Sequence, residues 1–257
     1  MSHAFQSLFA ERLTAFVSQK RTLGWSYNGS EAMLARFDRF CLEQYPALDT
    51  LTSEICLAWA VRRETEGNNS FRNRIATVRE FAKHLNRIGE QSFIIPAKFA
   101  KKGARPIPYV YSEEEIANIW REFDIIKPRK GYPVRHFVAP AFVRLLYCCG
   151  LRPCEARKLM VDDVNLVTGK LYIRESKGCK DRIVMMAGDV LEYFVQYNNK
   201  VSKAMPGRKQ FFPSSTDTVC EYRWIRYEFR KIREKLVLQQ ASSNPPRLYD
   251  FRYPHLN

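Results

Sequence analysis

The chain has 257 residues, of which 46% are apolar and 27% charged. This composition is typical of a globular protein with one or two domains and excludes a disordered or collagen-like chain. Its 42 Lys and Arg residues outnumber its 27 Asp and Glu residues, giving a formal net charge of +15. A polyanionic partner is therefore the first expectation, either nucleic acid or an acidic membrane surface. Residues 101–257 hold most of the excess, with 29 basic and 17 acidic side chains.

The cysteines and histidines do not predict a metal site. The seven cysteines are odd in number and contain no Cys-x-x-Cys pair, and the four histidines have no ligand spacing with them. We expect no metal and no disulfide framework, as in a reducing compartment. The start of the chain has no signal-peptide pattern, and the longest apolar stretch, residues 137–151, is interrupted by Arg144. These features predict a cytoplasmic protein without a membrane partner.

The first part of the chain predicts a helical domain, which we place at residues 1–92. Ser30 is a candidate N-cap for one helix, and another begins near Thr52. The clearest helix runs from Ser70 to Gly89. Its apolar positions follow the spacing of one helical face: Phe71, Ile75, Val78, Phe81, Leu85 and Ile88. The opposite face carries three basic residues: Arg72, Arg79 and Lys83. They form either a solvated face or a contact with a DNA backbone.

Residues 93–109 predict a linker between two domains. Prolines at positions 96, 106 and 108 prevent a continuous helix. The segment is basic through Lys98, Lys101, Lys102 and Arg105. A basic connector can follow a phosphate backbone, and it can equally serve only as a soluble linker. Both interpretations stay open.

Residues 110–257 predict a second domain that combines helices with a β-hairpin. A capping box of Ser112 and Glu115 begins it. Helices are expected at 136–149, where Gly150 is a candidate C-cap, and then at 155–160, 188–200 and 218–238. Alternating residues at 171–175 and 182–186 predict a β-hairpin with a basic turn. The expected fold class is therefore α+β, mainly α with a small β-hairpin or sheet.

The last expected helix carries an arginine stripe. Its members are spaced 3, 4 and 3 residues apart: Arg223, Arg226, Arg230 and Arg233. A solvated face is the default interpretation of such a stripe. Four arginines in register favour a contact with a DNA backbone or groove.

Three further basic residues suit phosphoryl chemistry without a metal: Arg152 after a helix, Lys177 at the hairpin turn and Arg252 near the end. Two guanidinium forks can hold the non-bridging oxygens of a phosphodiester, and an ammonium can protonate a leaving oxygen. Phosphate loops, nucleophile elbows and zinc-protease motifs are missing from the sequence. Simpler roles remain possible for all three, such as a helix-terminal charge for Arg152 or a pair with Asp250 for Arg252.

Three segments resemble the motifs of the tyrosine recombinases, the family of phage and transposon integrases. Residues 150–156 (GLRPCEA) are similar to the family's first arginine box, and residues 176–184 (SKGCKDRIV) to its lysine-bearing hairpin. Residues 249–253 (YDFRY) are similar to its His-x-x-Arg box. The order and spacing agree with the family, as does a basic helical domain in front, similar to the core-binding domain. The resemblance covers essentially the whole chain.

The resemblance implies a role for each matching residue. Arg152 and Arg252 hold the scissile phosphate, Lys177 protonates the 5′-hydroxyl leaving group, and Glu155 orients the site. The family's nucleophile is a tyrosine that forms a 3′-phosphotyrosyl bond with double-stranded DNA, without metal or cofactor. Two domains of the family enclose the duplex as a C-shaped clamp.

Two departures from the family pattern shape our expectations. Tyr249 stands where the family has histidine, which puts acid–base support there in question. Five residues follow Arg252, whereas the family's nucleophile lies several helical turns further on. We therefore expect a recombinase truncated before its nucleophile and unable to cut DNA by itself. Tyr249 and Tyr253 are disfavoured as substitutes, because most tyrosines pack or form hydrogen bonds.

Three hypotheses follow. The first is a recombinase or integrase of a mobile genetic element, catalytically incompetent as given. The second is a non-catalytic DNA-binding regulator that occupies recombination sites and competes with a full-length recombinase. Its partners on DNA would be a second copy of itself or that recombinase. The third is a decaying helical protein without retained activity.

Overall fold

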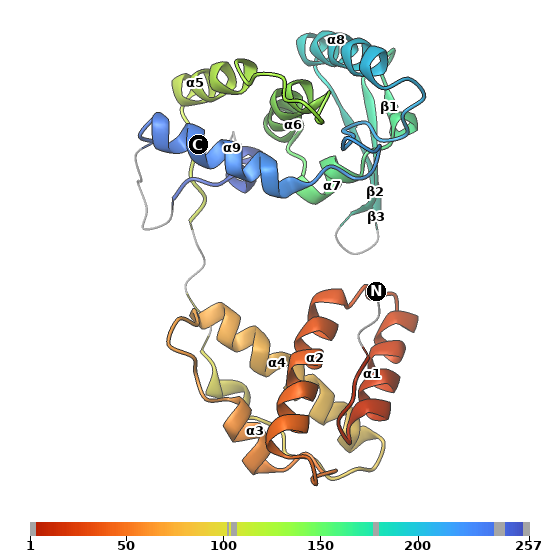
Figure 1. Cartoon of the computed structure of the whole chain (residues 1–257), viewed down its shortest axis with the longest axis vertical. Coiled ribbons are helices and arrows are strands. Elements are labelled where there is room, and N and C mark those ends of the chain that lie inside the picture. The colour runs from red at the N-terminus through yellow and green to blue at the C-terminus, as the bar shows by residue number, and fades with distance from the viewer. Residues whose placement is uncertain (1–3, 102, 104–106, 177–179, 239–244, 254–257) are drawn as a thin grey trace. The chain divides into compact units, whose positions relative to one another are not determined.

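The computed structural model describes residues 4–101, 103, 107–176, 180–238 and 245–253 (Figure 1). The chain divides into two compact units, Met1–Arg105 and Pro106–Asn257. Each unit has a hydrophobic core of its own. Helices dominate both, and a small antiparallel sheet lies in the second. The expected α+β class with a mainly helical content is confirmed.

The first unit is helical, as its periodicity predicts. Its elements are α1 (Ala10–Thr22), α2 (Asn28–Gln44), α3 (Ser53–Trp59), α4 (Asn68–Arg87) and the short 3-10 helix η1 (Ala97–Phe99). The side chain of Thr52 caps α3 by accepting from the backbone N–H of Ile55. The apolar face of α4 is buried against the other helices, with Ile75, Val78 and Phe81 fully enclosed. Burial of these faces holds the unit together.

Buried polar groups fix two loops of this unit. Arg74 lies on α4 with 2% of its side chain exposed and pairs with Glu66 at 2.6 Å. It also donates to the backbone oxygens of Trp59 and Val61, so one guanidinium ties down the segment between α3 and α4. Asp38 of α2 accepts from the backbone N–H groups of Gln6 and Ser7 before α1. These bonds satisfy backbone groups that the core would otherwise leave unpaired.

Part of the segment that the sequence assigns to the linker packs against the first unit. Ile95 and Ala100 are buried in its core. The backbone N–H of Phe93 donates to the oxygen of Leu51 at 2.8 Å, and Arg79 Nε donates to the oxygen of Ile95 at 2.9 Å. The alternation of apolar residues over 93–100 is too short to show this docking. The first unit therefore reaches past residue 92.

The second unit is built around a central helix. Its helical elements are α5 (Glu113–Asp124), α6 (Arg135–Cys149), α7 (Pro153–Lys158), η2 (Val161–Asp163), α8 (Gly188–Ala204), α9 (Tyr222–Lys235) and η3 (Leu248–Arg252). α6 is buried along most of its length and packs against α5, α8 and η3. The capping box of Ser112 and Glu115 begins α5 as predicted.

The sheet contains β1 (Val164–Asn165), β2 (Lys170–Ser176) and β3 (Lys180–Met185), in that spatial order and antiparallel throughout. Ile173 on β2 lies opposite Arg182 on β3. The hairpin of β2 and β3 was predicted from alternation, whereas β1 is too short to show a period. Leu171 and Ile173 turn inward to the core, so the hairpin is held at its base.

Candidate functional site

Arg152 sits at the junction of two helices. α6 ends at Gly150, whose φ of +60° is unfavourable for residues with a Cβ. The chain then becomes extended, and Arg152 occupies the N-cap position of α7, followed by Pro153 in the first turn. Glu155 accepts from the backbone N–H of Arg152 at 2.8 Å and from its Nη1 at 2.6 Å. One carboxylate thus fixes both the backbone and the side chain of Arg152. Arg152 caps the start of α7, whereas the simpler alternative gave it the role of a charge at the end of a helix.

The carboxylate of Glu155 is shared between two arginines. Only 4% of the Glu155 side chain is exposed. Arg182 on β3 donates Nη1 to Oε1 at 2.9 Å and Nη2 to Oε2 at 2.8 Å. The hydrogen bond with Glu155 raises the pKa of Arg152. Glu155 therefore connects the loop after α6 with the hairpin.

Arg252 and Tyr249 come from η3, one turn apart. Arg252 Nη1 donates to the hydroxyl of Tyr249 at 3.2 Å, and its guanidinium lies 5.7 Å from the centre of the Tyr249 ring. Asp250 does not take Arg252 as its partner. It is buried and accepts from Arg247 instead, at 2.7 Å from Nη2 and 2.9 Å from the backbone N–H. The alternative in which Arg252 neutralises Asp250 is therefore wrong.

η3 is attached to the core by aromatic packing. The rings of Tyr111 and Phe251 stack at 4.7 Å with an interplanar angle of 10°. The hydroxyl of Tyr111 donates to the backbone oxygen of Arg247 at 3.0 Å. Phe251 is fully buried, whereas Tyr249 is 38% exposed. This attachment presents Tyr249 and Arg252 on the outside of η3, beside the junction of α6 and α7.

The pKa of Tyr249 responds to both predicted phosphate-binding arginines. Partial burial raises the pKa of Tyr249, but hydrogen bonds and charge from Arg252, and then from Arg152, outweigh this effect and leave the pKa below its ordinary value. The phenolate form is thus stabilised by two cations that are 100 positions apart in the sequence. We call Arg152, Tyr249 and Arg252 the arginine–phenol cluster.

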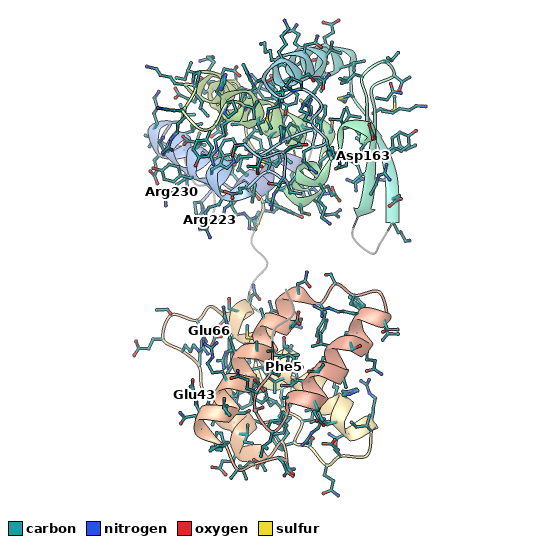
Figure 2. All side chains as sticks on the ribbon, turned by 45° about the vertical axis from the view of Figure 1, so that its right-hand side comes forward. Phe5, Glu43, Glu66, Asp163, Arg223 and Arg230 are labelled. Carbon is teal, nitrogen blue, oxygen red and sulfur yellow. The ribbon has the colours of Figure 1, made fainter. Side chains whose placement is uncertain are left out.

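The arginine stripe of α9 lies on a face of the helix other than the buried one. Ile225, Phe229 and Ile232 are buried, while Arg223 and Arg230 are exposed (Figure 2). Arg226 is exposed as well, and Arg233 is half-buried with its Nη1 donating to the backbone oxygen of Pro246 at 3.3 Å. Trp224 is only partly buried, so Ile225 is the residue that faces the core at this point.

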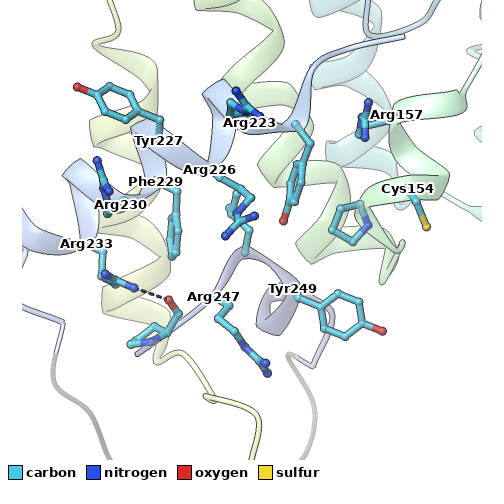
Figure 3. A pocket seen from close by; sticks show the side chains of 14 residues that line it. Cys154, Arg157, Arg223, Arg226, Tyr227, Phe229, Arg230, Arg233, Arg247 and Tyr249 are labelled. Carbon is cyan, nitrogen blue, oxygen red and sulfur yellow. Dashed lines mark hydrogen bonds between the residues drawn. The ribbon is translucent and has the colours of Figure 1, made fainter. Parts of the chain in front are cut away.

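The stripe lines a groove of about 840 Å³ that runs to the arginine–phenol cluster. We call this the arginine groove, because six arginines line it: Arg157, Arg223, Arg226, Arg230, Arg233 and Arg247. Figure 3 shows the arginines of α9 along one side and Arg247 and Tyr249 across from them. Phe229 and Leu248 contribute apolar surface to the lining. A surface with this charge suits a polyanion.

The basic residues predicted in the first unit differ in their surroundings. Arg72 and Lys101 are exposed. Arg79 is engaged with the oxygen of Ile95, and Lys83 pairs with Glu80 at 2.9 Å. These two bonds stabilise the unit itself. Lys102, Arg105 and Lys177 lie outside the described residues.

Arg182, like Arg157 and Arg247 of the arginine groove, is a site residue that was not predicted from the sequence. It belongs to the segment that resembles the lysine hairpin, but its partner Glu155 is 27 positions away and no spacing rule connects them. Within the ranges that the structure describes, no group of three or more His, Cys, Asp or Glu side chains is arranged to hold a metal ion. In the same ranges, no helix combines the length and the apolar character needed to cross a bilayer.

The model of the phage integrase family matches residues 126–255, which is half of the chain. This chain belongs to the phage integrase family. The match includes both arginines and the tyrosine of the arginine–phenol cluster, and also Glu155 and Arg182.

Two relatives of this integrase-family chain match nearly its whole length, and a third matches part of it. Two putative integrase/recombinases of Sinorhizobium fredii, y4rE and y4rB, are 25% and 29% identical over 97% and 96% of this chain, and over 80% of each relative. The tyrosine recombinase XerD of Staphylococcus haemolyticus is 27% identical over 60% of this chain and 50% of that protein.

Solved structures share the fold of this integrase-family chain. Lambda integrase bound to DNA aligns with a TM-score of 0.64 at 15% identity, over 97% of this chain and 85% of that one. The XerH site-specific recombinase bound to its difH substrate aligns with a TM-score of 0.63 at 16% identity, over 88% of this chain. The present chain spans 66% of the length of that recombinase.

Proposed function

We propose that this chain binds duplex DNA and that Arg152 and Arg252 together hold one phosphodiester of its backbone, as in a tyrosine-type recombinase or integrase. The observation that carries the proposal is the hydrogen bond from Arg252 to the hydroxyl of Tyr249, a group whose pKa the nearby Arg152 also lowers. A neutral phenol is a modest acceptor for two cations. A phosphodiester offers two non-bridging oxygens and a negative charge, so it is the better ligand for a pair of guanidinium forks.

The arginine groove supports DNA as the polyanion. It extends the positive surface away from the arginine–phenol cluster along α9. Contacts to successive phosphates would position a duplex without reading its sequence. The solved structures that share this fold include lambda integrase and XerH in complex with DNA.

The chemistry that we propose for the site is transfer of a phosphodiester to a tyrosine hydroxyl. The tyrosine gives up its hydroxyl proton to solvent and its oxygen attacks phosphorus, the bond to the 5′ oxygen breaks, and a 3′-phosphotyrosyl bond forms. Arg152 and Arg252 stabilise the extra negative charge on the phosphoryl oxygens in the transition state. Lys177 supplies the proton that the 5′ oxygen takes up on leaving. Glu155 keeps Arg152 in place. Reversal of these steps rejoins strands, as integration or excision of a mobile element requires.

One observation favours a second candidate, a DNA-bound regulator that competes with a full-length recombinase. Tyr249 stands where the family motif has histidine, and its hydroxyl accepts a hydrogen bond from Arg252. A phenol with arginine partners is less suited to exchange protons near neutral pH than an imidazole is. Such a regulator would use the same surface for DNA and would cut nothing.

Binding of duplex DNA, followed by fluorescence anisotropy, tests the proposal. Arg252→Gln is expected to weaken binding about tenfold, because a charge-assisted phosphate contact is lost. Lys203→Gln is the matched control, since Lys203 is an exposed cation on α8. Equal effects of the two substitutions would refute a phosphate site at the arginine–phenol cluster.

A nicked duplex separates the two candidates. Cleavage beside a nick releases a short strand and traps a covalent intermediate. A protein–DNA adduct that survives SDS supports strand transfer by a tyrosine of these 257 residues. Binding without an adduct, together with inhibition of a full-length relative, supports the regulator.

A further inference from the structure

Arg182 has a place in the structure that neither the family motif nor the proposed phosphate site explains. It lies on β3, opposite Ile173 of β2, and 33% of its side chain is exposed. Its guanidinium forks over both oxygens of Glu155. The same two oxygens accept from Nη1 and from the backbone N–H of Arg152. One buried carboxylate thus accepts hydrogen bonds from two arginines on different elements.

We propose that Arg182 is a positioning residue that sets the direction of Arg152 through the carboxylate they share, and so holds the phosphate-binding arginine and the base of the hairpin in one arrangement. This inference rests on the proposed function, in which Arg152 binds a DNA phosphate. Arg182 itself need not touch the phosphate for this role.

The geometry gives the physical reason. A buried carboxylate needs its acceptor sites filled, because an unsatisfied buried charge is costly. Arg182 fills one site on each oxygen, while Arg152 contacts Oε1 through Nη1. If Arg182 is removed, Arg152, which already contacts Oε1, can turn to fill the vacated sites. Turning its fork onto Glu155 would withdraw it from Tyr249 and from a phosphate bound there.

The charges lead to the same conclusion. Two guanidinium groups around one carboxylate leave a net charge of +1 in the group. With Arg182 absent, Arg152 and Glu155 form a neutral pair, which attracts a phosphate less strongly. Arg182 therefore acts on the phosphate site by orientation and by charge balance.

A second ion pair of the same sheet offers a matched comparison. Arg174 on β2 pairs with the buried Asp163 at 2.6 Å. Asp163 accepts from the backbone N–H of Met160 and caps η2. Loss of Arg174 thus breaks an ion pair between the hairpin and a buried carboxylate, as loss of Arg182 does. The carboxylate in this case is Asp163, which is not an ion-pair partner of Arg152.

The pKa of Tyr249 reports the position of Arg152 in the absence of DNA. The chain is labelled with 13C at tyrosine Cζ, and the Tyr249 signal is assigned from the Tyr249→Phe variant. Arg152 helps to lower the pKa of Tyr249. Arg182→Gln should therefore raise that pKa toward its ordinary value, and Arg182→Lys should raise it less. Arg174→Gln should leave it unchanged. A Tyr249 pKa that Arg182→Gln does not move, in a folded variant, overturns the proposal.

A double-mutant cycle measures the coupling between Arg182 and Arg152 in DNA affinity. Arg182→Gln should weaken duplex binding about tenfold alone and less than about twofold in an Arg152→Gln background, because its effect passes through Arg152. Equal losses in both backgrounds would show that Arg182 contacts DNA itself or acts only on stability, and would overturn the proposal. If the unmodified chain binds no DNA, the proposed function fails, whereas the Tyr249 titration still decides whether Arg182 positions Arg152.

Discussion

Arg252 donates a hydrogen bond of 3.2 Å to the hydroxyl of Tyr249, the residue that begins the same motif. Arg152, 100 positions before Arg252 in the sequence, also lowers the pKa of this hydroxyl. The phenol therefore accepts from one guanidinium group and is influenced by the charge of a second. Under the proposed function, a phosphate must share or displace these contacts, so the protonation state of Tyr249 is coupled to DNA binding.

DNA affinity is expected to fall at alkaline pH because of Tyr249. In the free protein the arginines lower the pKa of Tyr249 below its ordinary value. A bound phosphate opposes the phenolate, so the pKa of Tyr249 is higher in the complex than in the free chain. Affinity is then full below the free-state pKa, declines as pH rises through it, and levels off above the pKa of the complex. Anisotropy titrations across pH measure this decline.

Tyr249→Phe is the control for the pH dependence. The variant keeps the ring and loses the ionisable hydroxyl. Its affinity should decline only at the higher pH at which lysines lose their charge. A decline with an unchanged midpoint in Tyr249→Phe would assign the effect to another group.

The arginine groove predicts a change in salt dependence. Each phosphate that is neutralised by a cation contributes about −0.9 to the slope of log K against log salt concentration. Replacing both Arg223 and Arg226 by Gln should make the slope shallower by about 1 to 2. Lys231→Gln is the matched control, because Lys231 belongs to the same helix but pairs with Glu228 at 2.9 Å. A slope that responds equally to Lys231→Gln would mean that only net charge matters.

The attachment of η3 predicts a joint effect on stability and binding. Asp250→Asn removes the charge that holds Arg247 and caps η3, so the free energy of unfolding should fall by about 1.5–3 kcal/mol. DNA affinity should fall as well, because Tyr249 and Arg252 are on η3.

Asp217→Asn separates the two effects of that substitution. Asp217 accepts from the backbone N–H groups of Lys209 and Gln210, at 2.7 Å and 3.0 Å, in a loop outside the site. This variant should lose stability and keep its DNA affinity. Urea unfolding and anisotropy measure the two quantities. Unchanged DNA affinity in Asp250→Asn would contradict the role of η3.

The first unit depends on the buried pair of Arg74 and Glu66. Arg74→Met leaves the Glu66 carboxylate and the backbone oxygens of Trp59 and Val61 without their donor. The free energy of unfolding of this unit should fall by about 3–5 kcal/mol. Arg62→Gln, in the exposed part of the same loop, should cost less than about 1 kcal/mol. Thermal unfolding of the full chain measures both variants. Equal losses of unfolding free energy would contradict a special contribution of the buried pair to stability.

Local rules predicted most of the elements. The period of the apolar residues located α4, the side-chain oxygen of Ser112 marked the start of α5, and Gly150 marked the end of α6. These features depend on residues within a few positions of one another. The resemblance of three short motifs to a recombinase family located the site, since chain order and residue type suffice for that.

Contacts between residues distant in the sequence could not be predicted from local patterns. Arg74 and Arg79 lie on a helix with a clear apolar face, yet one is buried with Glu66 and the other bonds to the oxygen of Ile95. Nothing local distinguishes them from the exposed Arg72. The sharing of Glu155 by Arg152 and Arg182 likewise depends on how the hairpin packs against α7, which periodicity does not encode.

The most direct test of the account is the energetic coupling between Arg152 and Arg252 in duplex DNA binding. Arg152→Gln, Arg252→Gln and the double variant are compared with the unmodified chain by anisotropy at one salt concentration. If both guanidinium groups hold one phosphate, the double variant should bind about as weakly as the weaker single variant, because either substitution alone disables the site. Losses that simply multiply, or single variants that bind like the unmodified chain, would contradict the account.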